Sequence, residues 1–169
     1  MGYRLKIRRS PHETREHYIL KVATINELVR MGFSIDQIVL EKYYPNMNKT
    51  FLTDFYFASD YEDNVEKIGR EKLVFHKCYT RSFIDIVLET KPIVFFECLT
   101  KFPMASQWHL KIKSLELCAL TNRAKLIFVV PSKIRSFRKL NGVFLDGIWL
   151  VSLKEGKVVA KIGEKIKFL

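Results

Sequence analysis

SFIDIVLETKPIVFFECLTK, residues 82–101, decides the fold of this chain. Two apolar runs flank a Lys91-Pro92 turn, which predicts that they pair as antiparallel strands. Each run carries one carboxylate, Asp85 or Glu97, although buried strands rarely hold a charge without a partner or a metal. Two carboxylates on neighbouring strands can converge on one cation. The stretch therefore predicts both a hairpin and a candidate metal site.

The rest of the chain supplies helices and strands around this hairpin. The predicted elements are a helix from Pro11, capped by Ser10, to about Met31 and ended by Gly32, strands over 33–43, 83–90 and 92–100, a helix from Ser106 to about Asn122, a strand over 125–130, a short basic helix over 132–139, and strands over 147–153 and 157–162. Continuous apolar strands between amphipathic helices predict an α/β fold with a mixed central sheet flanked by helices.

Length and composition indicate a single domain over residues 1–169, since 48% of the residues are hydrophobic and 13% aromatic. Its least regular part is an insertion at about 44–81. The aromatic residues over 43–61 suit either base stacking or a dimer interface, and we favour the interface.

The sequence also indicates a cytoplasmic protein without a membrane segment. No apolar run approaches the length of a bilayer span, and the basic N-terminal residues do not read as a signal peptide. Cys78, Cys98 and Cys118 form no zinc or disulfide pattern, so we expect buried thiols in a reducing compartment. The two glutamines among many Lys, Glu and Ile residues favour a thermophilic source.

Net charge points to a nucleic-acid partner. The chain has 29 Lys and Arg against 18 Asp and Glu, a net charge of +11. Residues 3–9 are either an edge strand or a phosphate-binding arm. The basic runs at 4–9 and 133–139 either contact phosphates or form solvent-exposed faces without a partner. The candidate phosphate contacts are Arg4, Lys6, Arg8, Arg9, Lys111, Lys133, Arg135 and Arg138.

The two strand carboxylates suit a hard divalent cation. Mg²⁺ or Mn²⁺ is usually held by one or two carboxylates plus water, and it can polarise a phosphate and activate a water. A nearby lysine can stabilise the charge that develops on the phosphate. Asp85 and Glu97 are therefore the candidate metal ligands.

These features together resemble the PD-(D/E)xK nuclease superfamily, and most closely its archaeal Holliday-junction resolvase branch. The passage LVRMGFSI (28–35) resembles the family's passage from first helix to first strand, Ile84-Asp85 stands where Pro-Asp would, and Glu97 follows across a short turn. The resemblance implies a restriction-endonuclease-like αβββαβ core, a homodimer, and an archaeal or archaeal-virus source. It also implies Glu16 as an acidic residue on the first helix, with Glu13 as a competitor at that helix end.

One departure from the family pattern concerns the lysine. Leu99 occupies the position two after Glu97, where the family has its lysine. The next lysine is Lys101, whose Cα would lie about 13 Å from the Cα of Glu97 along an extended strand. Lys101 is the candidate catalytic lysine, with Lys111 or Lys113 as alternatives. The sequence thus predicts a Mg²⁺- or Mn²⁺-dependent DNA endonuclease with Glu16, Asp85, Glu97 and Lys101 as catalytic residues. Two other interpretations stay open: a DNA-binding module without catalysis on the same fold, and an RNA-binding protein.

Overall fold

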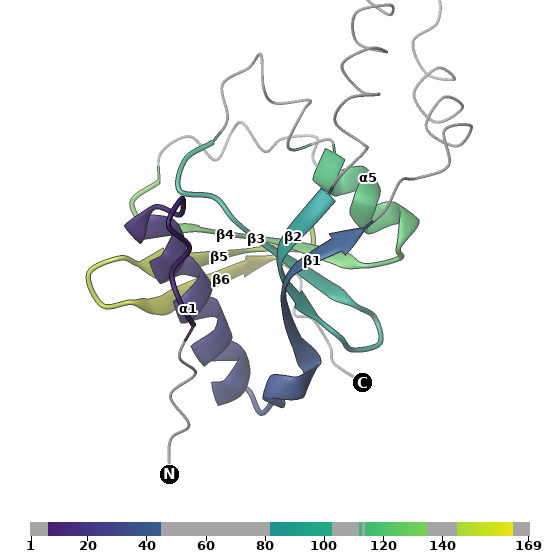
Figure 1. Cartoon of the computed structure of the whole chain (residues 1–169), viewed down its shortest axis with the longest axis horizontal. Helices are drawn as coiled ribbons and strands as arrows, with labels where there is room; N and C mark the ends of the chain where they lie inside the picture. The colour runs from purple at the N-terminus through teal and green to yellow at the C-terminus, as the bar shows by residue number, and fades with distance from the viewer. Residues whose placement is uncertain (1–6, 45–81, 103–111, 113, 135–144, 164–169) are drawn as a thin grey trace, which may run out of the picture.

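The computed structural model describes residues 7–44, 82–102, 112, 114–134 and 145–163. In this part of the chain one six-stranded mixed sheet carries a helix on each face, which confirms the predicted α/β class (Figure 1). The elements are α1 (Arg15–Arg30), the 3-10 helix η1 (Ile35–Gln37), β1 (Ile38–Tyr44), β2 (Ser82–Leu88), β3 (Val94–Cys98), α5 (Ser114–Thr121), β4 (Lys125–Pro131), β5 (Gly147–Ser152) and β6 (Lys157–Gly163).

The strands lie in the sheet in the order of the sequence, β1 to β6. The first three form an antiparallel meander, β3, β4 and β5 are parallel, and β6 returns antiparallel to β5. The chain passes through α5 between the parallel strands β3 and β4. We call the end of the sheet where β3, β4 and β5 finish its carboxyl end, and the opposite end its amino end. β1 also finishes at the carboxyl end, and β2 begins there.

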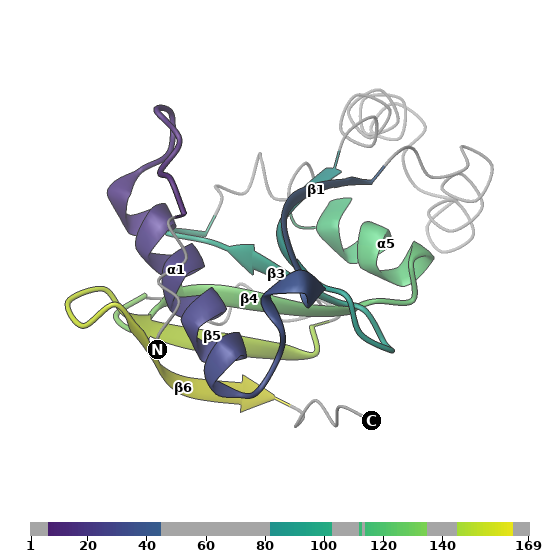
Figure 2. The same cartoon turned by 60° about the horizontal axis from the view of Figure 1, so that its bottom comes forward.

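Each helix covers its own apolar core on one face of the sheet. Leu20 and Leu28 of α1 pack with Phe96 of β3 and Trp149 of β5 on one face. α5 packs on the other face, where Leu115 meets strand residues from β2, β3 and β4. Figure 2 separates the two layers, with α1 across β4 to β6 and α5 beside β1 and β2.

The first helix begins four residues later than predicted. Thr14, not Ser10, is its N-cap, since the Thr14 side chain accepts from the His17 backbone N–H. Ser10 instead closes a turn, because its carbonyl accepts from the Glu13 N–H at 3.1 Å. The predicted end is confirmed, with Met31 as C-cap and Gly32 at a φ of +97°, a conformation that favours glycine.

Other predicted boundaries also move. Residues 33–43 are not one strand, because the 3-10 helix η1, capped by Ser34, precedes β1. Residues 132–134 form a turn rather than the start of a helix. The predicted helix start at Ser106 and most of the insertion lie outside the described residues. Within them, no helix is long and apolar enough to cross a membrane.

Candidate active site

The site forms where two strands change which face their side chains point to. In a regular strand Ile84 and Ile86 would share a face, yet Ile86 belongs to the α1 core and Ile84 to the α5 core. Leu40 and Tyr44 of β1 differ in the same way. The changes occur at Asp85 and Glu41, and Glu41 has a φ of +50°. Glu41 and Asp85 thereby both reach residues of α1.

Asp85 of β2 and Glu97 of β3 lie close to each other at the carboxyl end of the sheet. Asp85 Oδ2 accepts from the Cys98 backbone N–H at 2.8 Å, and Glu97 Oε2 accepts from the Asp85 backbone N–H at 3.4 Å. Each carboxylate thus bonds to the backbone of the other's strand. The Asp85 side chain keeps 17% of its surface exposed, whereas Glu97 is buried. The pair therefore combines a fixed position with access from solvent at Asp85.

His17 of α1 joins Asp85 to a third carboxylate. Its Nδ1 lies 2.7 Å from Glu13 Oε1, and its Nε2 lies 3.1 Å from Asp85 Oδ2. The hydrogen bond to Asp85 raises the pKa of His17 above its usual value, against the effect of burial. An imidazolium with two N–H donors fits this position, because a carboxylate faces each ring nitrogen. His17 therefore fixes the carboxylate of Asp85 from the helix side.

Lys21 adds a buried positive charge beside these residues. We call the whole group the carboxylate cluster, and its members are Glu13, His17, Lys21, Glu41, Asp85 and Glu97. Only 3% of the Lys21 side chain is exposed, and its Nζ lies 3.0 Å from Glu13 Oε1 and 2.9 Å from Glu41 Oε1. Burial disfavours the charged amine, but the hydrogen bonds to Glu41 and Glu13 raise the pKa of Lys21 above its usual value. Burial likewise opposes the charged form of Glu13, yet His17 and Lys21 lower its pKa. The ammonium is thus held charged inside the cluster.

Sequence reasoning missed Lys21, and it preferred Glu16 to Glu13 as the acidic residue of the first helix. Glu13, His17 and Lys21 follow one another at intervals of four residues, so they line one face of the chain that leads into and along α1. That spacing was visible in the sequence. The burial of Lys21 was not, because it depends on Glu41 from a distant strand. Glu16, the predicted helix acid, is exposed and takes no part in the cluster.

The predicted lysines lie elsewhere. Lys101 is exposed, three residues beyond the end of β3, and outside the cluster. Leu99, at the position of the family lysine, is buried in the α5 core. Lys111 and Lys113 lie outside the described residues.

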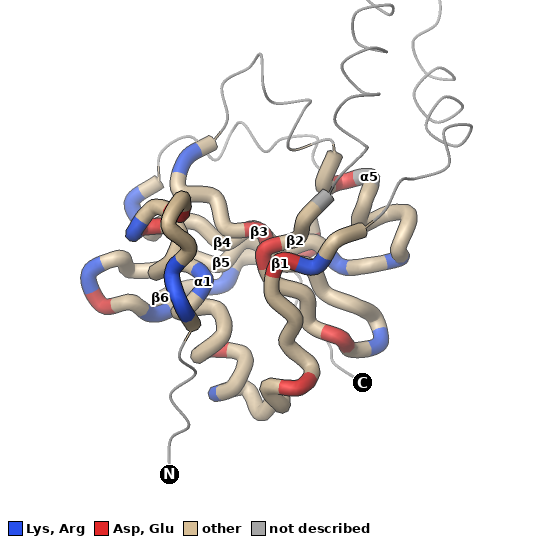
Figure 3. Tube along the Cα trace, viewed as in Figure 1, with Lys and Arg blue, Asp and Glu red and all other residues tan. Residues whose placement is uncertain are grey.

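Only some of the predicted phosphate contacts lie within the described residues. Lys133, Arg8 and Arg9 are exposed, and Arg9 Nε donates to the Glu13 carbonyl at 2.9 Å. Arg4, Lys6, Arg135 and Arg138 lie outside the described residues. Figure 3 shows acidic positions gathered where β1, β2 and β3 meet, and basic positions along the β5–β6 hairpin and on the chain before α1.

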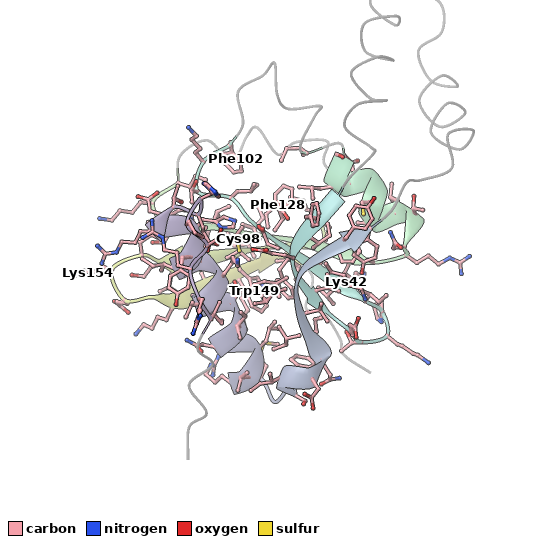
Figure 4. All side chains as sticks on the ribbon, viewed as in Figure 1. Lys42, Cys98, Phe102, Phe128, Trp149 and Lys154 are labelled. Atoms are coloured by element: carbon pink, nitrogen blue, oxygen red, sulfur yellow. The ribbon has the colours of Figure 1, made fainter. Side chains whose placement is uncertain are left out.

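The cysteine at the centre of the site is structural. Cys98 lies at the middle of the molecule in Figure 4, and it is fully enclosed by the α1 core. Burial, together with the negative charges of Asp85 and Glu97, raises the pKa of the Cys98 thiol well above its usual value. Cys98 and Cys118 are buried thiols that form no disulfide, as predicted, and Cys78 lies outside the described residues.

The two carboxylates of Asp85 and Glu97 suit a hard cation whose remaining ligands are water molecules. Among the described residues, no three His, Cys, Asp or Glu side chains converge closely enough to hold a metal ion by themselves. Asp85 and Glu97 supply two carboxylates, and Mg²⁺ is commonly held by one or two carboxylates with water completing its shell. The oxygen-only pair suits Mg²⁺ or Mn²⁺ better than Zn²⁺.

Comparison with known proteins identifies no relative of this chain. No protein-family model, no curated protein and no solved structure matches the chain. The functional argument therefore depends on the geometry of the carboxyl end of the sheet.

Proposed function

We propose that the protein is a Mg²⁺- or Mn²⁺-dependent endonuclease that hydrolyses phosphodiester bonds in DNA. The observation that carries this proposal is the pair of hydrogen bonds that links Asp85 and Glu97 at the carboxyl end of the sheet, each side chain accepting from a backbone N–H of the other's strand. Three further features support it: the net charge of +11, the buried ammonium of Lys21, and the order helix, three strands, helix, strand. That order suits a restriction-endonuclease-like core, and we extend the proposal to a homodimer by the same resemblance.

Most residues of the cluster have a proposed role. Asp85 and Glu97 would hold the cation, which when bound polarises the phosphate and lowers the pKa of a water. His17 and Glu13 orient Asp85, as carboxylate and imidazole partners orient ligands in many sites. Lys21 takes the electrostatic role that the sequence predicted for Lys101, because its buried ammonium pairs with Glu13, the carboxylate that also contacts His17.

Hydrolysis of the phosphodiester requires no other reactant than water. The oxygen of water bonds to phosphorus, and the bond from phosphorus to O3′ breaks. The proton of the water passes to solvent, and O3′ takes up a proton to become a hydroxyl. The products are a 5′-phosphate and a 3′-hydroxyl.

A cleavage assay on supercoiled plasmid with Mg²⁺ or Mn²⁺ tests the proposal. We expect Asp85→Asn and Glu97→Gln to lower the cleavage rate by about 1,000-fold, since several kcal/mol of charge stabilisation is lost. Asp146→Asn is a matched control, because Asp146 Oδ2 also accepts a backbone N–H at 2.8 Å, from Leu126, far from the cluster. Equal cleavage by Asp85→Asn and wild type would show that another site or a contaminating nuclease acts.

A second candidate function is a DNA-binding module without catalysis. The burial of Leu99 among apolar side chains favours it, because the family's lysine position is then part of the core. Salt-dependent DNA binding by the wild type, with no cleavage under any divalent metal, would support the module over the enzyme.

A further inference from the structure

Each of the three parallel strands is followed by an exposed lysine at the carboxyl end of the sheet. Lys101 follows β3 by three residues, and Lys133 and Lys154 follow β4 and β5 by two residues each. Lys154 projects from the tip of the β5–β6 hairpin in Figure 4. We call these three residues the lysine row. Sequence reasoning gave Lys101 a catalytic role and Lys133 a phosphate contact, and it did not single out Lys154.

The lysine row lies beside the carboxylate cluster. Glu97 and Cys98 are the last two residues of β3, so the row begins at the strand that carries the cluster and extends away over β4 and β5. Neighbouring strands are about 4.8 Å apart, so the strand ends that carry the row span about 10 Å. This arrangement places positive charge along one side of the site.

The lysine row differs from several other lysines of the described residues, which have carboxylate partners. Lys42 pairs with Glu89, Lys125 with Asp146, and Lys157 with Glu155. Within the described residues, by contrast, no carboxylate lies within ion-pair distance of Lys101, Lys133 or Lys154. No described carboxylate therefore neutralises the charge of these three lysines.

We infer that the lysine row binds the phosphate backbone of duplex DNA and lays the duplex across the carboxyl end of the sheet. This inference rests on the proposed function, since it names the surface that would hold the substrate of the Asp85–Glu97 site. Duplex DNA carries one charge per about 1.7 Å of helix axis, so a row about 10 Å long meets several phosphates. Lysines act as point charges on phosphate and carry no base preference, so the row predicts binding independent of sequence.

Binding measured against salt, without cleavage, tests the row. A labelled duplex of mixed sequence is titrated with protein in a chelating buffer at several NaCl concentrations, and log K is plotted against log[NaCl]. We expect Lys101→Gln, Lys133→Gln and Lys154→Gln each to make the slope about 0.9 less negative, and to weaken binding roughly 10-fold near 0.1 M salt. The triple variant should change the slope by about 2.7.

Lys91→Gln is the matched control. Lys91 is also exposed and without an ion-pair partner among the described residues, but it lies in the β2–β3 turn at the amino end. We expect its slope to equal that of the wild type. Thermal melts of all variants check folding, which exposed lysines should leave unchanged.

The outcomes separate this inference from the proposed function. Unchanged slopes in the row variants, in a protein that still cleaves, would overturn the row and leave the nuclease. Reduced slopes in a protein that never cleaves would support the row as a DNA-binding surface and overturn the nuclease. Tighter binding of a matched RNA duplex at the same salt would overturn the assignment to DNA.

Discussion

The two ends of the sheet each hold an aspartate that accepts a backbone N–H at 2.8 Å, but their surroundings differ. At the amino end, Asp146 accepts from Leu126 and pairs with one lysine, Lys125. At the carboxyl end, Asp85 accepts from the Cys98 backbone N–H, and its Oδ2 also lies 3.1 Å from His17 Nε2, next to Glu97. A single capped and paired carboxylate is sufficient to close a strand end. Closing the strand end therefore does not explain the additional carboxylates at the carboxyl end.

Charge balance sharpens the comparison. At the amino end one carboxylate meets one ammonium. At the carboxyl end the three carboxylates of Glu13, Glu41 and Asp85 contact two basic side chains, His17 and Lys21. Assembling buried charges costs free energy unless they are well paired, and arrangements of this kind concentrate at functional sites. We interpret the carboxyl end as a cation site built at the expense of stability, and the amino end as purely structural.

Lysine substitutions at the two ends give the largest expected contrast. We expect Lys21→Met to lower the cleavage rate about 100-fold, and to lower the free energy of unfolding by about 3 kcal/mol because buried Glu13 loses one of its two partners. Lys125→Met should change the free energy of unfolding by less than about 1 kcal/mol and leave cleavage unchanged. Urea denaturation and the plasmid assay measure both quantities.

Lys21→Arg distinguishes electrostatics from folding. This variant keeps the charge, so we expect it to recover part of the stability and more of the activity than Lys21→Met. Cleavage by folded Lys21→Met at the wild-type rate would remove Lys21 from the proposed site.

The choice between Glu13 and Glu16 gives a smaller contrast. Glu13 reaches His17 and Lys21, whereas Glu16 is exposed. We expect Glu13→Gln to slow cleavage by about 10- to 100-fold, the usual effect of losing a residue that orients a metal ligand. Glu16→Gln should cleave within about two-fold of wild type, since surface substitutions rarely matter. The reverse ranking would restore the assignment made from sequence.

Glu27 provides the smallest expected effect and shows how a structural carboxylate behaves. It lies in the last turn of α1, where hydrogen bonds from Arg30, and less strongly from Lys161, lower its pKa to about 2. Its stabilisation is complete above its unfolded pKa of 4.5, and it is lost as pH falls toward 2. We expect a contribution of about 1–2 kcal/mol, because Arg30 and Lys161 are exposed partners.

Unfolding measured at pH 6 and pH 2.5 checks this contribution. The wild type should lose about 1–2 kcal/mol more than Glu27→Gln between the two pH values. Identical losses in both proteins would mean that the Glu27 pairs do not stabilise the fold.

The fold was largely predictable, because its signals are local. Alternating and continuous apolar runs identified β2, β3 and β4, and Gly32 marked the end of α1. The start of α1 was wrong because Ser10 and Thr14 are both good caps. Only the contacts of the turn at Ser10 to Glu13 decide between them.

The site was half predictable, and the missing half is long-range. Asp85 and Glu97 were visible as charges inside apolar strands. Lys21 was not, because its burial requires Glu41, whose side chain reaches α1 only through a positive φ in β1. A lysine inside an amphipathic helix ordinarily lies in solvent, so no sequence pattern reports such a partner.

The binding of Mn²⁺ to the folded protein tests the central claim most directly. Isothermal titration at low salt should show an ion bound by the wild type and by Asp146→Asn with similar affinity. Asp85→Asn and Glu97→Gln should each weaken that binding by about 10-fold or more, since each removes one of two carboxylate ligands. Equal affinity in all four proteins, or no binding by the wild type, would contradict the claim that Asp85 and Glu97 hold one cation.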